Sequence, residues 1–231
     1  MGNRIPIATD EWYHCYNRGV DKRQVFIDED DYERFLLLLY LCNDEESSTR
    51  VVDLEMKQIR LAKVLEHRTI TRTVPLVDIA AYACMPNHVH FIMRQISDGG
   101  LPRFMQKVFT GYTMYFNQKY ERTGPLFSGA YKSKHIDTDE YFKHAIQYVL
   151  LNPVELVQPN WKKGMGDRSL IETQLLTYRY ASVQDFFGGK RPEGKIVHDV
   201  RKEYFDRRPS LSAMLRDAQL YYRENARFLE R

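Results

Sequence analysis

The sequence of 231 residues has few cysteines and no long apolar run. Its cysteines, Cys15, Cys42 and Cys84, are odd in number, lie far apart and form no Cys-x-x-Cys pair, so the sequence indicates neither a disulfide framework nor a zinc knuckle. No apolar segment approaches the roughly 18 residues that a transmembrane helix needs. The segment from Met1 to Glu11 also lacks the basic start and apolar centre of a secretory signal. We therefore expect a cytoplasmic protein without membrane contacts, whose cysteines are reduced and mostly buried.

A strong excess of one charge is also missing. The formal net charge of +3 is only mildly basic and does not by itself identify a nucleic-acid partner. The distribution is more informative: between Leu101 and Lys134 six basic residues stand against a single acid, Glu121, and aromatic residues are interleaved with the cations. Cations for phosphates and rings for unstacked bases favour single-stranded nucleic acid. The alternative is an amphipathic helix whose rings fill the core, and for most of these rings it is the better interpretation.

The pattern of apolar residues predicts an α+β fold. Two short apolar segments, 76–83 and 88–95, favour strands joined by a tight turn at residues 85–87, and a helix is favoured for 28–41 by its acidic start and apolar body. The full predicted order is a strand from residue 11 to a turn at 17–19, a helix over 28–41, strands over 76–83 and 88–95, a helix over 101–120, a strand over 130–136 and a helix over 140–151. This order predicts a ferredoxin-like or RRM-like antiparallel sheet with helices packed on it.

Two regions fall outside this pattern. Residues 43–73 are a polar stretch followed by helical spacing over 51–67, which predicts an inserted helix. Beyond residue 160 the periodicity weakens, although residues 210–231 are typical of a capped helix of mixed charge. We expect a main domain over 1–160 and a partly helical C-terminal extension over 161–231. The extension would add nucleic-acid-binding surface, mediate a homodimer, or pack on its own core.

Two histidines lie one residue apart in the apolar segment ACMPNHVHFIM. In a strand, His88 and His90 project from the same face while Val89 points to the other. Neutral imidazole is the commonest metal ligand in proteins, so the pair can bind one ion. The alternative is two structural histidines on a half-exposed strand, the more frequent explanation of an isolated His-x-His motif.

A second polar stripe lies on the predicted helix 140–151 and its exit. His144, Tyr148 and Asn152 recur every four residues and so share one face. In a chain with 16 tyrosines, a tyrosine on a helix is often a core residue. The polar neighbours of Tyr148 on its face favour a polar site instead.

The segments MPNHVHFIM, GPLFSGAYKS and YVLLNPV, together with YHCYNRG near the N-terminus, resemble the single-tyrosine HUH transposases, in particular the REP-associated tyrosine transposases. The resemblance covers about residues 12–157. It implies that His88, His90 and Asn152 bind a divalent ion, Mg²⁺ or Mn²⁺, and that Tyr148 is the nucleophile. It further implies a nucleoid-associated, metal-dependent enzyme that cleaves and transfers single-stranded DNA beside a hairpin repeat, through a 5′-phosphotyrosine intermediate.

The basic residues near these motifs are candidates for binding that DNA. Lys132 and Lys134 alternate on a short strand and can contact phosphate, although lysines that keep an edge strand soluble are an equally good explanation. The complete predicted DNA-binding set is Arg18, Arg103, Lys107, Lys132 and Lys134. His14 and His144 are candidates for the second shell of the metal. After the asparagine–proline pair the chain has Glu155, where the family often has a basic residue.

Two other functions fit parts of the sequence. A non-catalytic, RRM-like module that binds single-stranded nucleic acid would use the same basic and aromatic residues, but it would not require His88, His90, Tyr148 and Asn152 together. A metal-dependent hydrolase would activate water at the ion and would need carboxylates nearby, and none flanks the histidine pair.

Overall fold

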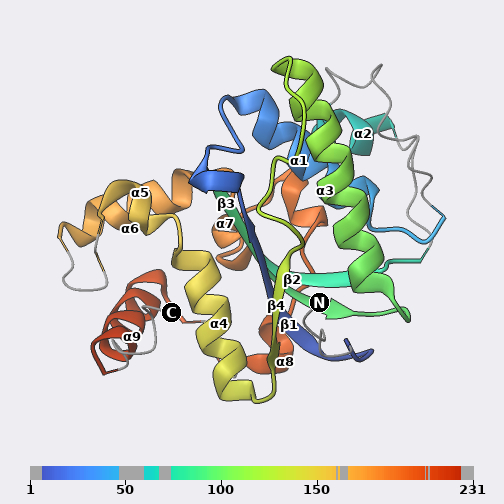
Figure 1. The fold of residues 1–231 in the computed structure, drawn as a ribbon. Helices are drawn as coiled ribbons and strands as arrows, with labels where there is room; N and C mark the ends of the chain where they lie inside the picture. Colours follow the sequence, from blue (N-terminus) through green and yellow to red (C-terminus); the bar gives the residue numbers. More distant parts are fainter. Residues whose placement is uncertain are drawn as a thin grey trace.

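The computed structural model describes residues 7–46, 60–67, 74–159, 161, 166–205, 207 and 209–224. Its centre is a four-stranded antiparallel sheet made of β1 (Trp12–Arg18), β2 (Val77–Met85), β3 (His88–Gln95) and β4 (Lys132–Ile136), in the order β2-β3-β1-β4 (Figure 1). β1 pairs with both β3 and β4, so β4 forms an edge of the sheet. The predicted α+β class and the ferredoxin-like strand order are confirmed.

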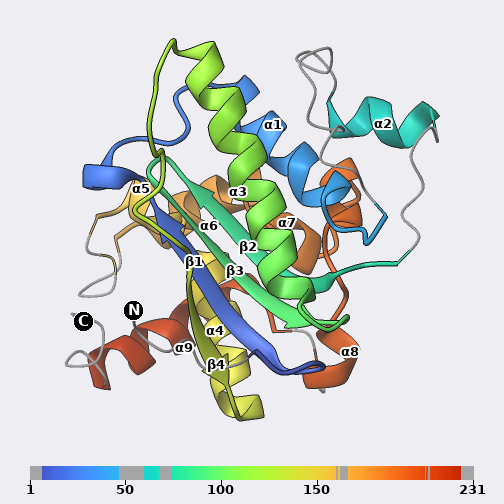
Figure 2. The ribbon, with the colours of Figure 1, turned by 45° about the vertical axis from the view of Figure 1, so that its right-hand side comes forward.

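Helices cover both faces of this sheet. α1 (Glu29–Leu41) and α3 (Gly100–Lys119) lie on one face, and α4 (Asp139–Leu151) lies on the other; α3 crosses in front of the sheet in Figure 2. Alternation along the strands separates two cores: Cys15 and Phe91 pack toward α1 and α3, whereas Trp12 and Ile92 pack toward α4. The strands are therefore buried on both sides over most of their length.

Local capping explains where two of these helices begin. Asp28 and Asp31 form a capping box at the start of α1, with the Asp31 amide donating to Asp28 Oδ1 over 3.1 Å. At the start of α4, Thr138 Oγ1 accepts a hydrogen bond from the Tyr141 amide at 3.2 Å. α4 ends at Leu151, just before Pro153. Both helices agree closely with their predicted ranges, and α4 carries the predicted stripe of polar residues.

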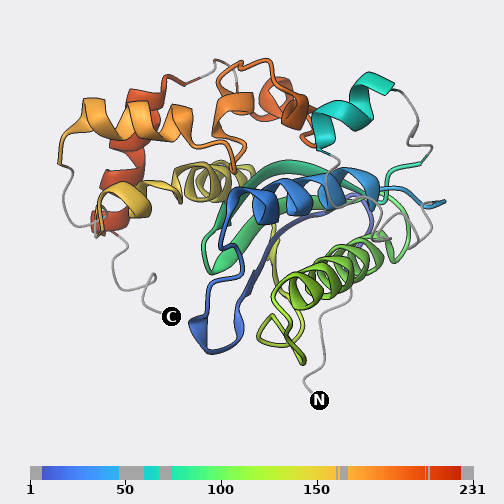
Figure 3. The same cartoon turned by 90° about the horizontal axis from the view of Figure 1, so that it is seen from above.

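The C-terminal extension packs on the outer side of α4. It follows the short helix α5 (Val154–Val157) and contains α6 (Arg168–Thr177), α7 (Val183–Phe186), a 3-10 helix (Pro192–Lys195), α8 (Arg201–Tyr204) and α9 (Leu211–Glu224). Trp161, Met214 and Leu215 are buried in the same core as Phe142 and Ile146 of α4. Figure 3 shows these helices gathered on the α4 side, away from α3. The weak periodicity of this region did not predict α6, whereas the predicted C-terminal helix is present as α9.

The insertion is described only in part. α2 (Leu61–His67) coincides with the end of the helix predicted over 51–67, and the rest of that prediction lies outside the described residues. Residues 225–231, the end of the predicted C-terminal helix, also lie outside them. In the part of the chain that the structure describes, no helix is long and apolar enough to cross a membrane.

Candidate functional site

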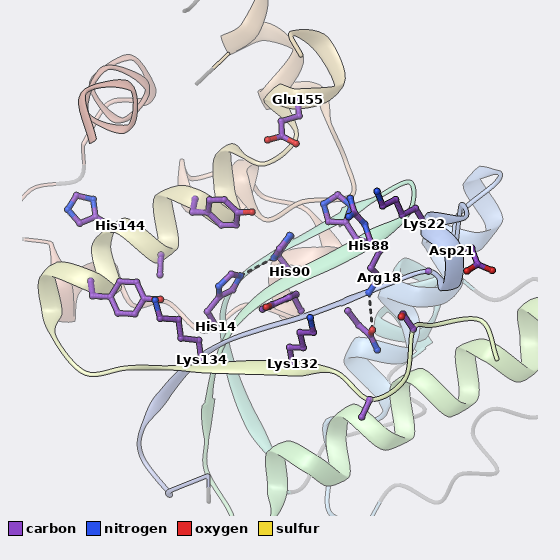
Figure 4. A pocket seen from close by; sticks show the side chains of 18 of the residues that line it. His14, Arg18, Asp21, Lys22, His88, His90, Lys132, Lys134, His144 and Glu155 are labelled. Carbon is purple, nitrogen blue, oxygen red and sulfur yellow. Dashed lines mark hydrogen bonds between the residues drawn. The ribbon is translucent and has the colours of Figure 1, made fainter. Parts of the chain in front are cut away.

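A pocket of about 770 Å³ opens on the α4 side of the sheet, beside β4 (Figure 4). Side chains from β1, β3, β4, α4, α5 and α9 converge on it. The predicted site residues that line it are His14, Arg18, His88, His90, Lys132, Lys134, His144 and Tyr148. Residues far apart in the sequence thus share one cavity.

The two histidines of β3 project into this pocket, as the strand period predicts. The ring centroids of His88 and His90 are 5.1 Å apart, with an interplanar angle of 85°. His88 Nδ1 donates to Asn87 Oδ1 over 2.6 Å, and His90 Nδ1 lies 2.9 Å from His14 Nε2. Each ring thus uses Nδ1 in a hydrogen bond to a neighbouring side chain. Metal-binding histidines are commonly held in this way, since it presents Nε2 to the ion.

His14 is an electrically neutral neighbour of this pair. Burial, assisted by the positive charge of Lys134, lowers the pKa of His14 from 6.5 to about 4. A neutral imidazole has one acceptor nitrogen, so His14 Nε2 can accept the hydrogen of His90 Nδ1. In that tautomer His90 has its lone pair on Nε2. The contact supports the hypothesis that His14 is a second-shell residue.

Asn152 supplies a buried oxygen one helical turn beyond Tyr148. Its Oδ1 has no hydrogen-bond partner among the described residues, and the side chain is buried without lining the pocket. An unsatisfied buried acceptor costs about 1–3 kcal/mol, so this oxygen would gain from a ligand, but the Asn152 side chain would have to turn into the pocket to reach an ion at His88 and His90. Two imidazoles and an amide oxygen form a donor set that fits a divalent ion.

The described residues contain no group of three or more His, Cys, Asp or Glu arranged to hold a metal. A metal bound by His88 and His90 would therefore need an uncharged third ligand, such as Asn152, or oxygen atoms from its substrate. Phosphate oxygens meet this requirement because they are hard, anionic donors.

Tyr148 packs directly against the histidines. Its ring meets His90 edge to face at a centroid distance of 5.3 Å and meets His14 in the same way at 5.6 Å. Burial raises the pKa of Tyr148 above its ordinary value, the negative charge of Glu155 raises it further, and hydrogen bonding by Asn152 opposes the shift. The phenol is therefore protonated near neutral pH. Any nucleophilic role requires additional positive charge near its oxygen.

Cations and rings line the remainder of the pocket. The Lys132 ammonium lies 5.9 Å from the ring centroid of Tyr16, and that of Lys134 lies 4.7 Å from the centroid of Tyr141. The predicted set leaves out several further lining residues, among them Tyr16, Lys22, Tyr141, Glu155 and Tyr221. Figure 4 shows Glu155 facing the pocket from a different side than the lysines of β4. Of these residues, only Glu155 has a signal in the sequence: it is an acid at the position after the asparagine–proline pair where a basic residue is expected.

Two of the predicted DNA-binding residues lie away from this pocket. Arg103 and Lys107 belong to α3, on the opposite face of the sheet. Arg103 Nη1 is 3.8 Å from Glu45 Oε1, and Lys107 Nζ donates to the Asp44 carbonyl oxygen over 2.9 Å. Any DNA contact by these residues would thus be separate from the pocket.

Comparisons with known proteins give fold-level neighbours alone. No protein-family model matches the chain, and no curated protein matches it in sequence. It is similar to a solved REP-associated tyrosine transposase bound to a REP hairpin, at 14% identity and a TM-score of 0.45, covering 92% of this chain and 95% of that one. It is also similar to tRNA(His) guanylyltransferase from Saccharomyces cerevisiae, at 12% identity and a TM-score of 0.30, covering 78% of this chain and 81% of that one. Neither value assigns the chain to a family.

Proposed function

We propose that this protein is a metal-dependent DNA-nicking and joining enzyme of the tyrosine transposase type, acting on single-stranded DNA beside a hairpin. The observation that carries the proposal is the packing of the Tyr148 ring against His90 and His14 in a pocket lined with cations. A phenol, two imidazoles on one strand face and several ammonium groups are the side chains that a metal-dependent attack of tyrosine on a DNA phosphate requires.

His88 and His90, with Asn152 Oδ1, are the residues that would hold Mg²⁺ or Mn²⁺, and the ion would withdraw charge from the non-bridging oxygens of the phosphate. Asn87 and His14 hold the two imidazole rings through their Nδ1 atoms. This second layer fixes the direction of both Nε2 atoms before any ligand arrives, which lowers the cost of ordering the site.

Tyr148 performs the covalent step. Its phenolic oxygen attacks the phosphorus atom, the bond from phosphorus to the 3′ oxygen breaks, and the 3′-hydroxyl leaves with a proton. The 5′-phosphotyrosine keeps the energy of the phosphodiester, so a second hydroxyl can reverse the reaction and join a new strand. Lys132, Lys134 and Arg18 would bind the DNA phosphates and offset the effect of Glu155 on the phenol.

The main alternative is a non-catalytic module that binds single-stranded nucleic acid. It is favoured by one observation: the described residues contain no group of three metal-binding side chains of the His, Cys, Asp and Glu types. Such a module would bind DNA equally well with and without a chelator. A homodimer through α9 and a location at the nucleoid remain predictions under either function.

The decisive experiment is a search for a covalent adduct. A labelled single-stranded hairpin with unpaired flanks is incubated with the protein and Mn²⁺, and SDS-resistant adducts are separated by electrophoresis. We expect adducts with the wild type, none with Tyr148→Phe, and none after addition of EDTA. Tyr180→Phe is the control, because Tyr180 is half-buried like Tyr148 but does not line the pocket. Undiminished adducts in Tyr148→Phe would refute the assignment, and EDTA-insensitive binding without adducts would support the alternative.

A further inference from the structure

One end of the pocket combines Lys134, a proposed phosphate contact, with three residues that the proposed cleavage does not use. Tyr141 and His144 come from α4, Lys134 comes from β4, and Tyr221 comes from α9 of the C-terminal extension. Figure 4 shows Lys134 and His144 on the side of the pocket away from His88. The extension, for which the sequence offered no catalytic motif, therefore forms part of the pocket wall.

The rings at this end are arranged in two contacts. Tyr221 stacks on His144 with centroids 4.1 Å apart and an interplanar angle of 22°. Tyr141 lies under the Lys134 ammonium at 4.7 Å, and a hydrogen bond to Tyr141 raises the pKa of Lys134 above its ordinary value. The ammonium is accordingly charged at every physiological pH. Both tyrosines are half-buried, so each is held in place and still reaches the pocket.

His144 adds a polar atom to this wall. Its Nδ1 is buried and has no hydrogen-bond partner among the described residues. Its other nitrogen, Nε2, lies 4.0 Å from the carboxylate of Glu140, whose side chain is 89% exposed, so that contact is weak. Because the atom itself has almost no exposed surface, a ligand in the cavity can reach it only if the His144 ring turns.

The placement of Tyr221 follows from the packing of α9. Leu211, Met214, Leu215 and Ala218 of this helix are buried against the α4 core. Tyr221 follows Ala218 by three residues, so it lies on the same face of α9 and extends that buried stripe to the pocket. The apolar face of α9 thus fixes the position of the helix, and Tyr221 at the end of that face lines the pocket.

Two tyrosine rings and one fixed cation match the chemistry of a nucleotide. Flat rings stack on a base, and a cation binds the neighbouring phosphate. A simple anion would not need the rings, and an apolar ligand would not need Lys134. Tyr141 lies two turns, about 10 Å, before Tyr148 on α4, close enough for both to contact one strand.

We propose that Tyr221, Tyr141, His144 and Lys134 form a subsite for one unpaired nucleotide of single-stranded DNA, next to the phosphate held at Tyr148. The inference rests on the proposed function for the identity of the strand, and it makes the C-terminal helix α9 part of the substrate-binding site. The base lies against the tyrosine rings, and the phosphate of that nucleotide lies against Lys134.

The test measures DNA binding with the full-length protein in EDTA, where no cleavage occurs. A hairpin oligonucleotide with unpaired flanks is prepared as a series in which one flanking nucleotide at a time is made abasic, and affinities are measured by fluorescence anisotropy. For the wild type, one abasic position should weaken binding by about 5- to 150-fold, the range for loss of one base–ring stack. Tyr221→Ala should weaken binding of the intact oligonucleotide by a similar factor, and the abasic position should then cost nothing further.

Two variants keep the result interpretable. Tyr221→Phe retains the ring and should restore the abasic penalty that Tyr221→Ala removes. Leu220→Ala alters an exposed neighbour on α9 and should also bind like the wild type. If every abasic oligonucleotide binds like the intact one, or if Tyr221→Ala leaves the abasic penalty unchanged, the subsite is refuted.

The outcome is separable from the fate of the proposed function. Loss of the abasic penalty in Tyr221→Ala without any covalent adduct would retain the subsite and reject the nicking reaction. Adducts through Tyr148 without a position-dependent abasic penalty would retain the reaction and reject the subsite. A wild type that binds no single-stranded oligonucleotide would reject both.

Discussion

Asn87 is the residue whose replacement tests most directly whether the histidine pair is a metal site. Its Oδ1 accepts the 2.6 Å hydrogen bond from His88 Nδ1, and its Nδ2 donates to the Lys22 carbonyl oxygen over 3.2 Å. The second bond fixes the orientation of the amide, so an oxygen must face His88. Asn87→Ala removes both bonds but leaves every proposed ligand in place.

The magnitude can be worked out from these two bonds. Each hydrogen bond contributes about 0.5–1.5 kcal/mol to stability, so the free energy of unfolding should fall by about 1–3 kcal/mol. If His88 binds an ion through Nε2, loss of the partner on Nδ1 should weaken metal affinity by about 10- to 100-fold. A purely structural role predicts the first effect without the second.

The assay is calorimetric titration of Mn²⁺ into the protein, together with urea unfolding of the same samples. Asn117→Ala is the matched control: its Nδ2 donates to the Gly124 carbonyl oxygen over 2.8 Å and its Oδ1 accepts from Arg122 over 2.9 Å, at the far end of α3. This control should lose comparable stability and keep its Mn²⁺ affinity. Equal Mn²⁺ affinity in the two variants would show that Asn87 does not position a metal ligand.

Three further predictions concern protonation and the core. Glu155→Gln removes the charge that, after burial, most raises the pKa of Tyr148, so adduct formation should begin at lower pH than in the wild type; an unchanged pH profile would contradict this. Because the pKa of His14 is about 4 in the folded protein and 6.5 unfolded, the unfolded chain gains a proton first as pH falls, and about 3 kcal/mol of stability is lost between these values. His14→Gln should abolish that loss. The check is urea unfolding of both proteins at pH 7 and pH 4: the urea midpoint should fall less between these pH values in the variant than in the wild type. Trp161→Ala, at a side chain 1% exposed, should cost about 3–5 kcal/mol in urea unfolding, and a loss below 1 kcal/mol would show that the extension is not part of the cooperative core.

Sequence patterns predicted the elements that have strong local determinants. The acidic start of α1 became a capping box, Thr138 capped α4, and the two apolar segments around Pro86 became paired strands. The period of a strand also predicted that His88 and His90 share a face. These inferences depend on neighbours in the chain, which is why one sequence was enough.

The parts that were missed depend on tertiary contacts. Tyr221 reaches the pocket because α9 packs on α4. Lys22 reaches it because the turn after β1 is hydrogen-bonded to Asn87. Neither contact has a signal in the sequence. Arg103 and Lys107 were grouped with the pocket lysines by composition, but the ring-rich face of α3 packs on the other side of the sheet. Composition can identify a basic helix, but it cannot assign the helix to a face.

One face of β1 connects the stability of the protein to the proposed chemistry. Trp12, His14 and Tyr16 project from it in turn: Trp12 packs on Phe142 at 5.0 Å, His14 bonds to His90, and Tyr16 lines the pocket. The start of this face is therefore covered by apolar side chains of α4 such as Phe142. Its later part is covered by Tyr148 and the neighbours of Tyr148. Since the outer side of α4 is held by the C-terminal extension, a change in that packing would move Tyr148 relative to His90 without altering any site residue. The geometry on which the proposed reaction depends is thus set as much by the hydrophobic face of the extension as by the histidines.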